Sequence, residues 1–185
     1  MDPGVSEKLM RAKAISTSVL LLCLSAAAFA QDVHVTYNHG IDFTQFHTYA
    51  WGQMPKPSQV KNPKLAQEAQ NQLNATLAAK GLQMVALTAK PDLILTISGA
   101  SQEKTFYSNY DSSGTVLTAG TDYGTPEQKL VGALVVDLYD SNAKKMVWRG
   151  TAIGVMNQKS FEKNKELVDK AISKMFDKFP YSPGM

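Results

Sequence analysis

Residues 129–156, KLVGALVVDLYDSNAKKMVWRGTAIGVM, contain the pattern that decides the fold. Two stretches rich in β-branched and aromatic residues, 129–140 and 144–156, flank the polar sequence DSNA at 140–143. Two β-rich runs on either side of a short polar turn are typical of a β-hairpin. We therefore expect an antiparallel hairpin in the C-terminal half of the chain.

Further strand patterns lie upstream of this hairpin. Val33, Val35 and Tyr37 alternate with polar residues, which is the two-residue period of a half-buried strand. The other expected strands are residues 46–51, 82–87 and 91–98, and residues 103–110 either continue the last strand or pair with it. Residues 111–126 are rich in Gly, Ser and Thr and are expected to form a surface loop.

Two segments have the periodicity of amphipathic helices. In residues 63–80 apolar residues recur every four positions, with Asn62 available as the cap and Pro63 at the first helical position. In residues 160–178 apolar residues recur at i, i+3 and i+4, and charged residues cover the other side. Each helix has one apolar stripe, so we predict an α+β fold: a largely antiparallel sheet with two helices packed on one face.

The N-terminal 30 residues have the organisation of a secretory signal peptide. Arg11 and Lys13 precede the apolar run 14–30, AISTSVLLLCLSAAAFA, which ends in the A-x-A motif. The alternative is a membrane anchor, but a spanning helix needs about 20 apolar residues, and this run is shorter. We predict cleavage after Ala30, which leaves residues 31–185 as a single domain, and no transmembrane segment in the mature chain. Translation starts at Met1 or at Met10.

The only cysteine, Cys23, lies inside the apolar run of the predicted signal peptide. Leu22 precedes it, where a lipoprotein attachment site requires a small residue. We therefore expect an unlipidated periplasmic protein with no thiol chemistry in its mature form. The chain has 19 basic and 16 acidic residues, a net charge of +3, which is too balanced for a nucleic-acid-binding protein.

No spacing of polar residues predicts a catalytic or metal site. His34, His39 and His47 lack the close spacing that places two metal ligands on one face, so we expect no metal and no cofactor. Phosphate-loop and nucleophile-elbow motifs are also absent from the sequence. Asp137 and Asp140 lie on one arm of the predicted hairpin and Arg149 lies on the other, so we expect Arg149 to form a cross-strand ion pair with one of the two carboxylates.

Two aromatic segments are candidates for recognition. Residues 42–51 could form a ligand cleft, although we expect their large aromatic side chains to anchor this strand to the core. Residues 99–128 combine aromatic side chains with Gly, Ser, Thr and Asn, a composition suited to adaptable contacts, or they form a disordered connection. The candidate ligand-binding or partner-binding residues here are Phe106, Tyr107, Tyr110 and Tyr123.

Several segments in order resemble the DUF4136 domain family. They are DFTQFHTYAW at 42–51, KG at 80–81, PDL at 91–93, GALVVDLYD at 132–140, KMVWRG at 145–150, and FP at 179–180 after the last helix. The resemblance implies a bacterial exported domain of unknown biochemical function. The family has no known catalytic residues that could be assigned to positions in this sequence. Many members are envelope lipoproteins, from which this chain departs by lacking the attachment motif.

These observations leave three functional hypotheses. We favour a non-enzymatic binding or scaffolding module of the bacterial cell envelope, whose partner would be an envelope protein or a glycan. The alternative is a carboxylate-dependent hydrolase of cell-wall or polysaccharide material that uses Asp92 or Asp137. A third hypothesis is storage of a small ligand between helix and sheet. The sequence leaves the oligomeric state open.

Overall fold

The computed structural model of the protein describes residues 31–53, 61–107 and 126–181. The predicted signal peptide and residues 111–125 of the predicted surface loop lie outside the described residues. The elements, in chain order, are β1 (Asp32–Tyr37), η2 (Phe43–Gln45), β2 (Thr48–Trp51), α2 (Pro63–Ala79), β3 (Gln83–Met84), η4 (Leu87–Ala89), β4 (Leu93–Tyr107), β5 (Pro126–Asp140), β6 (Lys145–Met156) and α3 (Phe161–Asp177).

The six strands form one sheet in the order β1-β6-β5-β4-β2-β3. The β1–β6, β6–β5 and β5–β4 pairs are antiparallel, which confirms the predicted hairpin and the largely antiparallel sheet. The sheet is nevertheless mixed, because β2 runs parallel to both β3 and β4. Parallel neighbours need a long crossover connection, and α2 lies in the connection between β2 and these strands.

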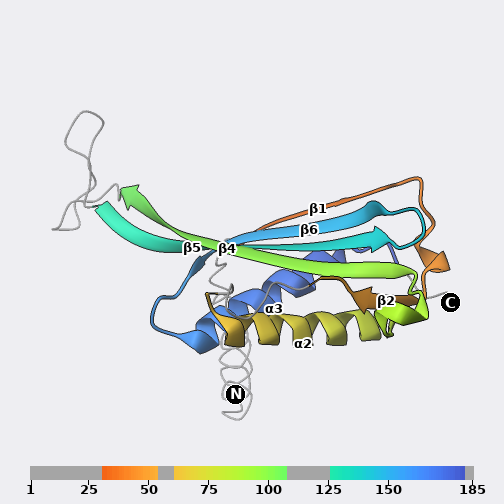
Figure 1. Ribbon diagram of the computed structural model, residues 1–185. Helices are drawn as coiled ribbons and strands as arrows, with labels where there is room; N and C mark the ends of the chain where they lie inside the picture. The colour runs from red at the N-terminus through yellow and green to blue at the C-terminus, as the bar shows by residue number, and fades with distance from the viewer. Residues whose placement is uncertain (1–30, 54–60, 108–125, 182–185) are drawn as a thin grey trace, which may run out of the picture. The chain divides into compact units, whose positions relative to one another are not determined.

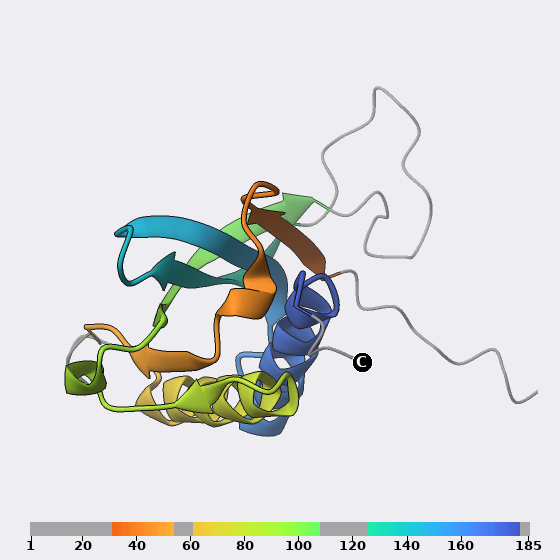
Figure 2. The same cartoon turned by 90° about the vertical axis from the view of Figure 1, so that its right-hand side faces the viewer.

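Both helices cover the same face of the sheet, as predicted (Figures 1 and 2). Helix α2 begins where expected, because the Asn62 side chain accepts a hydrogen bond of 3.0 Å from the backbone N–H of Leu65. It ends before Gly81, whose φ of 88° lies in the left-handed region that glycine adopts without a steric penalty. Helix α3 is capped by Ser160. None of the described helices is long and apolar enough to span a membrane.

The core lies between the helices and one half of the sheet. Trp148 is fully buried there against Phe176, with ring centroids 4.8 Å apart. Phe43, Phe46 and Tyr49 are also buried, which confirms that the aromatic residues of 42–51 anchor this segment to the core. These large side chains fill the space at the end of the molecule where β2 begins.

The structure differs from the sequence prediction at three strands. Strand β2 begins at Thr48 rather than at residue 46, because Phe43–Gln45 form a 3₁₀ turn capped by Asp42. The strand expected at 82–87 is reduced to two residues. Strand β4 is continuous through Tyr107, so the described part of 103–110 continues this strand rather than pairing with it.

Candidate functional site

The helix-covered face of β4 changes from large to small side chains part-way along the strand. Leu93 and Leu95 are fully buried on this face. Because successive side chains alternate between the two faces of a strand, Ile97, Gly99 and Ser101 lie on the same face. The apolar filling of the core therefore stops after Ile97.

The next two strands of the sheet, β5 and β6, also change from large to small side chains at this level. Gly132 of β5 pairs with Ser101 of β4, and on its other side it pairs with Gly154 of β6. Ala152 of β6 pairs with Leu134 of β5, which is itself the partner of Gly99. Small residues therefore lie beside one another on three adjacent strands.

These small residues leave an apolar groove of about 580 Å³ between the sheet and the two helices. The first turns of α2 form one wall with Leu65, Ala66 and Ala69, and the middle of α3 contributes Leu167 and Ala171. The volume lies within the range of about 300–1,000 Å³ that is common for small-molecule sites. We refer to this feature as the small-residue groove.

Exposure distinguishes the inner part of the small-residue groove from its mouth. The lining residues Leu65, Ala69, Ala152 and Ala171 are buried and form the inner part. The exposed lining residues, among them Lys61 and Gly99, belong to the start of α2 and to β4. Strand β4 pairs with β2 only through Leu95, so within the described residues its outer edge is unpaired beside the groove. The mouth therefore lies between β4 and the first turns of α2.

Most of the lining is apolar, and some of its polar groups are already engaged. The Gln31 side chain donates a hydrogen bond of 2.9 Å to the backbone carbonyl of Leu167, and Asn62 caps α2. Lys61 is the only charged residue among the described residues of the lining, and none of these residues is aromatic. The groove is thus suited to hold an apolar group and contains no acid–base pair.

The carboxylates that were considered for hydrolysis make structural contacts. Arg149 donates two hydrogen bonds to Asp137, of 2.6 and 2.8 Å, which confirms the predicted cross-strand pair. The Asp137 carboxylate raises the pKa of the Arg149 guanidinium above its usual range. Asp140 accepts two backbone N–H bonds within the hairpin turn. Asp137 and Asp140 therefore serve separate structural contacts rather than acting as a pair.

Asp92 joins the beginnings of β2 and β4. It accepts hydrogen bonds of 2.9 Å from the backbone N–H groups of His47 and Thr48 and from the Thr48 hydroxyl. Burial opposes ionisation of Asp92, but these hydrogen bonds outweigh it and lower the pKa of the carboxyl. Within the described part of the chain, no group of three or more His, Cys, Asp or Glu residues could hold a metal ion.

The four aromatic residues predicted for recognition are not brought together by the described structure. Phe106 lies on β4 with 40% of its surface exposed, and the Lys129 ammonium lies 5.5 Å from the centroid of its ring. Tyr107 ends this strand, whereas Tyr110 and Tyr123 lie outside the described residues. Their role in recognition stays a prediction.

The residues that line the small-residue groove were not predicted from the sequence. Storage of a ligand between helix and sheet was one of the three hypotheses, and the groove lies in that place. The sequence does contain small residues at alternate positions of three strands, which could have indicated a groove. Whether these residues lie beside one another depends on the strand register, which the sequence alone does not give.

The fold defines a class of protein, an α+β domain with a mixed sheet and two helices on one of its faces (Figure 1). The family model described as "Domain of unknown function (DUF4136)" matches residues 33–181. The chain belongs to the DUF4136 family.

Solved structures share this fold. A DUF4136 family protein from Bacteroides thetaiotaomicron is 15% identical, with a TM-score of 0.54, over 83% of this chain and 98% of that protein. A PDZ domain protein from Parabacteroides distasonis is 16% identical with a TM-score of 0.54. The match covers 82% of this chain but only 36% of the PDZ domain protein.

A third likeness is to a dodecamer of PelC from Paraburkholderia phytofirmans, which is 16% identical over 79% of this chain and 95% of that one, with a TM-score of 0.47. A comparison with curated proteins finds no match.

Proposed function

We propose that this protein is an exported, non-enzymatic binding module of the bacterial envelope, and that it binds an apolar ligand in the small-residue groove. The groove itself is the observation that carries this proposal. An apolar hollow exposed to water is unfavourable, by about 25 cal/mol for each Å² left unburied. A ligand that covers this surface would therefore gain free energy from the same effect.

Packing does not force the groove to be open at Gly99. A Cβ atom built on Gly99 would meet only the backbone oxygen of Ala133, at 3.6 Å, which is an ordinary contact. By contrast, a Cβ on Gly132 would come within 2.5 Å of the Met156 sulfur. A larger side chain at position 99 would thus be accommodated and would fill space that the present sequence leaves open.

The contacts of Asp92 and Asp137 make the hydrolase hypothesis the weaker one. Each carboxylate accepts hydrogen bonds that hold together neighbouring strands. A hydrolytic carboxylate pair needs two acids that converge on a substrate and have separated pKa values. The described contacts of these two residues serve the fold instead.

The envelope part of the proposal rests on the sequence of residues 1–30. The basic start, apolar centre and A-x-A end support export to the periplasm with cleavage after Ala30, and Leu22 before Cys23 supports an unlipidated product. Mass spectrometry of the protein from the periplasmic fraction of its host should give a chain that begins at Gln31. An intact N-terminus, or a mass increased by lipid, would contradict this part of the proposal.

The binding part is tested with a neutral fluorescent apolar probe, N-phenylnaphthylamine, added to the purified protein. We expect saturable binding to the unsubstituted chain and a loss of at least about tenfold in affinity in Gly99→Leu, because the new side chain fills the groove. The matched control is Gln102→Leu, which places the same side chain on the opposite face of β4, outside the lining. Equal binding by both variants would reject the groove as the site.

A further inference from the structure

The lining of the small-residue groove suits a flexible aliphatic chain, and it offers a planar ring apolar contact without an aromatic partner. Aromatic side chains are the usual partners of ring-shaped ligands, and the described lining contains none. Sugars need several polar partners, whereas most of this lining is apolar and two of its polar side chains, those of Gln31 and Asn62, are already hydrogen-bonded within the protein. The Leu, Ile, Val and Ala side chains of the lining offer contact to methylene groups.

The open part of the sheet face lies over β4. Gly132 of β5 and Gly154 of β6 are covered by the side chains of Met156 and Leu167, which a Cβ atom on these glycines would meet at 2.5 and 3.3 Å. A Cβ atom on Gly99 of β4 meets only a backbone oxygen, at 3.6 Å. A ligand that entered from the β4 side would therefore lie over β4 and contact the Met156 and Leu167 side chains, which also line the groove.

Positive charge lies at the mouth of the groove. Lys61 is exposed, lines the groove and precedes Asn62, the cap of α2, so that it adjoins the positive end of the helix dipole. No carboxylate among the described residues lies within ion-pair distance of Lys61. Among the described residues, the head group of a bound chain would therefore meet a cation that has no carboxylate partner.

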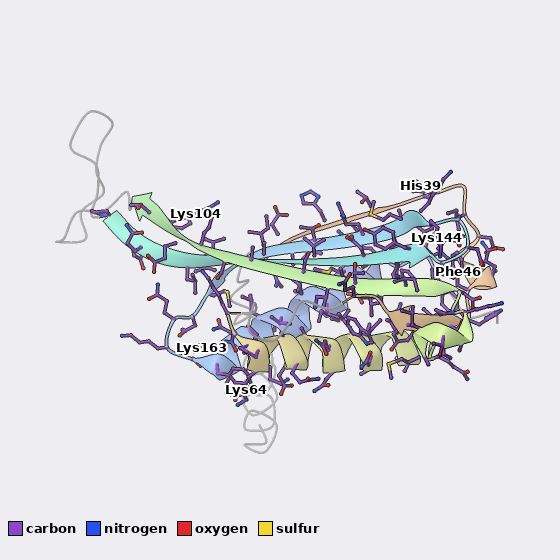
Figure 3. The ribbon with its side chains drawn as sticks, viewed as in Figure 1. His39, Phe46, Lys64, Lys104, Lys144 and Lys163 are labelled. Atoms are coloured by element: carbon purple, nitrogen blue, oxygen red, sulfur yellow. The ribbon has the colours of Figure 1, made fainter. Side chains whose placement is uncertain are left out.

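Further lysines lie near Lys61 and add to the positive charge at this end of the helices. Lys64 follows on the first turn of α2, and its ammonium lies 4.0 Å from the centroid of the Phe161 ring at the start of α3. Lys163 lies at the same end of the molecule (Figure 3). Glu162 is the acidic residue in the first turn of α3. The lysines outnumber it and give this end of the helical layer a net positive charge.

We infer that the ligand is a single-chain anionic amphiphile of the fatty-acid type, with its alkyl chain in the groove and its carboxylate at Lys61. This inference rests on the proposed function and adds the chemical class of the ligand. Apolar contact supplies the binding energy, and the lysine selects the charge of the head group.

The test compares three probes that share one alkyl chain: decanoate, decanol and decylammonium. Each is titrated against the purified protein loaded with N-phenylnaphthylamine, at low salt. We expect decanoate to displace the probe at the lowest concentration and decylammonium at the highest. Lys61→Gln should weaken decanoate about fivefold and leave decanol unchanged, because a partly exposed charge pair is a modest interaction.

The matched control is Lys178→Gln, which removes the same charge at the opposite end of α3. It should leave all three affinities unchanged. If decanol matches decanoate and Lys61→Gln has no effect, the charge inference is wrong while the groove is still a binding site. If none of the three displaces the probe, or Gly99→Leu binds decanoate as well as the unsubstituted chain, the proposed function fails as well.

Discussion

Asp92 connects two segments that lie far from it in the sequence, the start of β2 and the β5–β6 turn. Its carboxylate binds the first residues of β2, its backbone N–H donates to the Thr48 hydroxyl, and its carbonyl accepts from the Ser141 N–H in the β5–β6 turn. These contacts fix the relative positions of β2, β4 and the hairpin.

Asp92→Ala should lower the free energy of unfolding by about 1–3 kcal/mol, because it leaves backbone donors at His47 and Thr48 without their acceptor. Urea denaturation at neutral pH measures this loss. Asp32→Ala is the control, since Asp32 is exposed and lies 3.5 Å from the exposed His34, and it should change stability by less than about 0.5 kcal/mol. An equal effect of the two substitutions would contradict the role of Asp92.

The difference in stability between the unsubstituted chain and Asp92→Ala should depend on pH. The pKa of Asp92 is lower in the folded state than its ordinary value of 3.8, so its stabilising effect is complete above that value and is lost as the pH falls through the folded pKa. The difference in stability between the unsubstituted chain and Asp92→Ala should therefore shrink as the solution is acidified below 3.8. A difference that stays constant down to strongly acidic pH would show that the carboxylate charge is not involved.

At the scale of elements, glycines of the sheet have opposite roles at the two ends of the core. A Cβ on Gly150 would lie 2.6 Å from Trp148 and 2.8 Å from the sulfur of Met175, both of which are fully buried. Gly99 has no such neighbour on its helix-facing side. One glycine therefore permits close packing, and the other leaves the groove open.

The same substitution should thus have opposite effects at these two positions. Gly150→Ala should destabilise the protein by about 1–3 kcal/mol through overpacking against Trp148. Gly99→Ala should leave stability unchanged or raise it by up to about 1 kcal/mol, because glycine is unfavourable inside a strand. Chemical denaturation of the two variants measures both changes, and a large loss in Gly99→Ala would contradict the open space assigned to that position.

Elements with a strong local pattern were predictable from the sequence. The β5–β6 hairpin and both helices have periodic apolar residues and turn or cap residues at their ends, so their type and approximate bounds follow from short-range rules. The parallel placement of β2 beside β4 was not predicted, because it depends on a crossover between segments that lie far apart in the sequence. The groove was missed for the same reason. Ser101, Gly132 and Gly154 become neighbours only once the register of three strands is known.

For the molecule as a whole, the two helices serve the two halves of the sheet differently. Over one half, α3 packs Ile172 and Phe176 into a filled core with Trp148. Over the other half, its earlier turns line the groove with Leu167 and Ala171. The filled half stabilises the domain, and we propose that the open half binds the ligand.

The most direct test of this central claim is a titration of the protein with decanoate, followed by NMR of alanine methyl groups. We expect the methyl signals of Ala66, Ala69, Ala152 and Ala171, all in the lining, to shift in a saturable manner. Ala50, buried in β2 outside the lining, and Ala143, exposed in the hairpin turn, should not shift. Shifts confined to residues outside the groove, or no saturable shift at all, would contradict the binding of an apolar chain between the helices and the sheet.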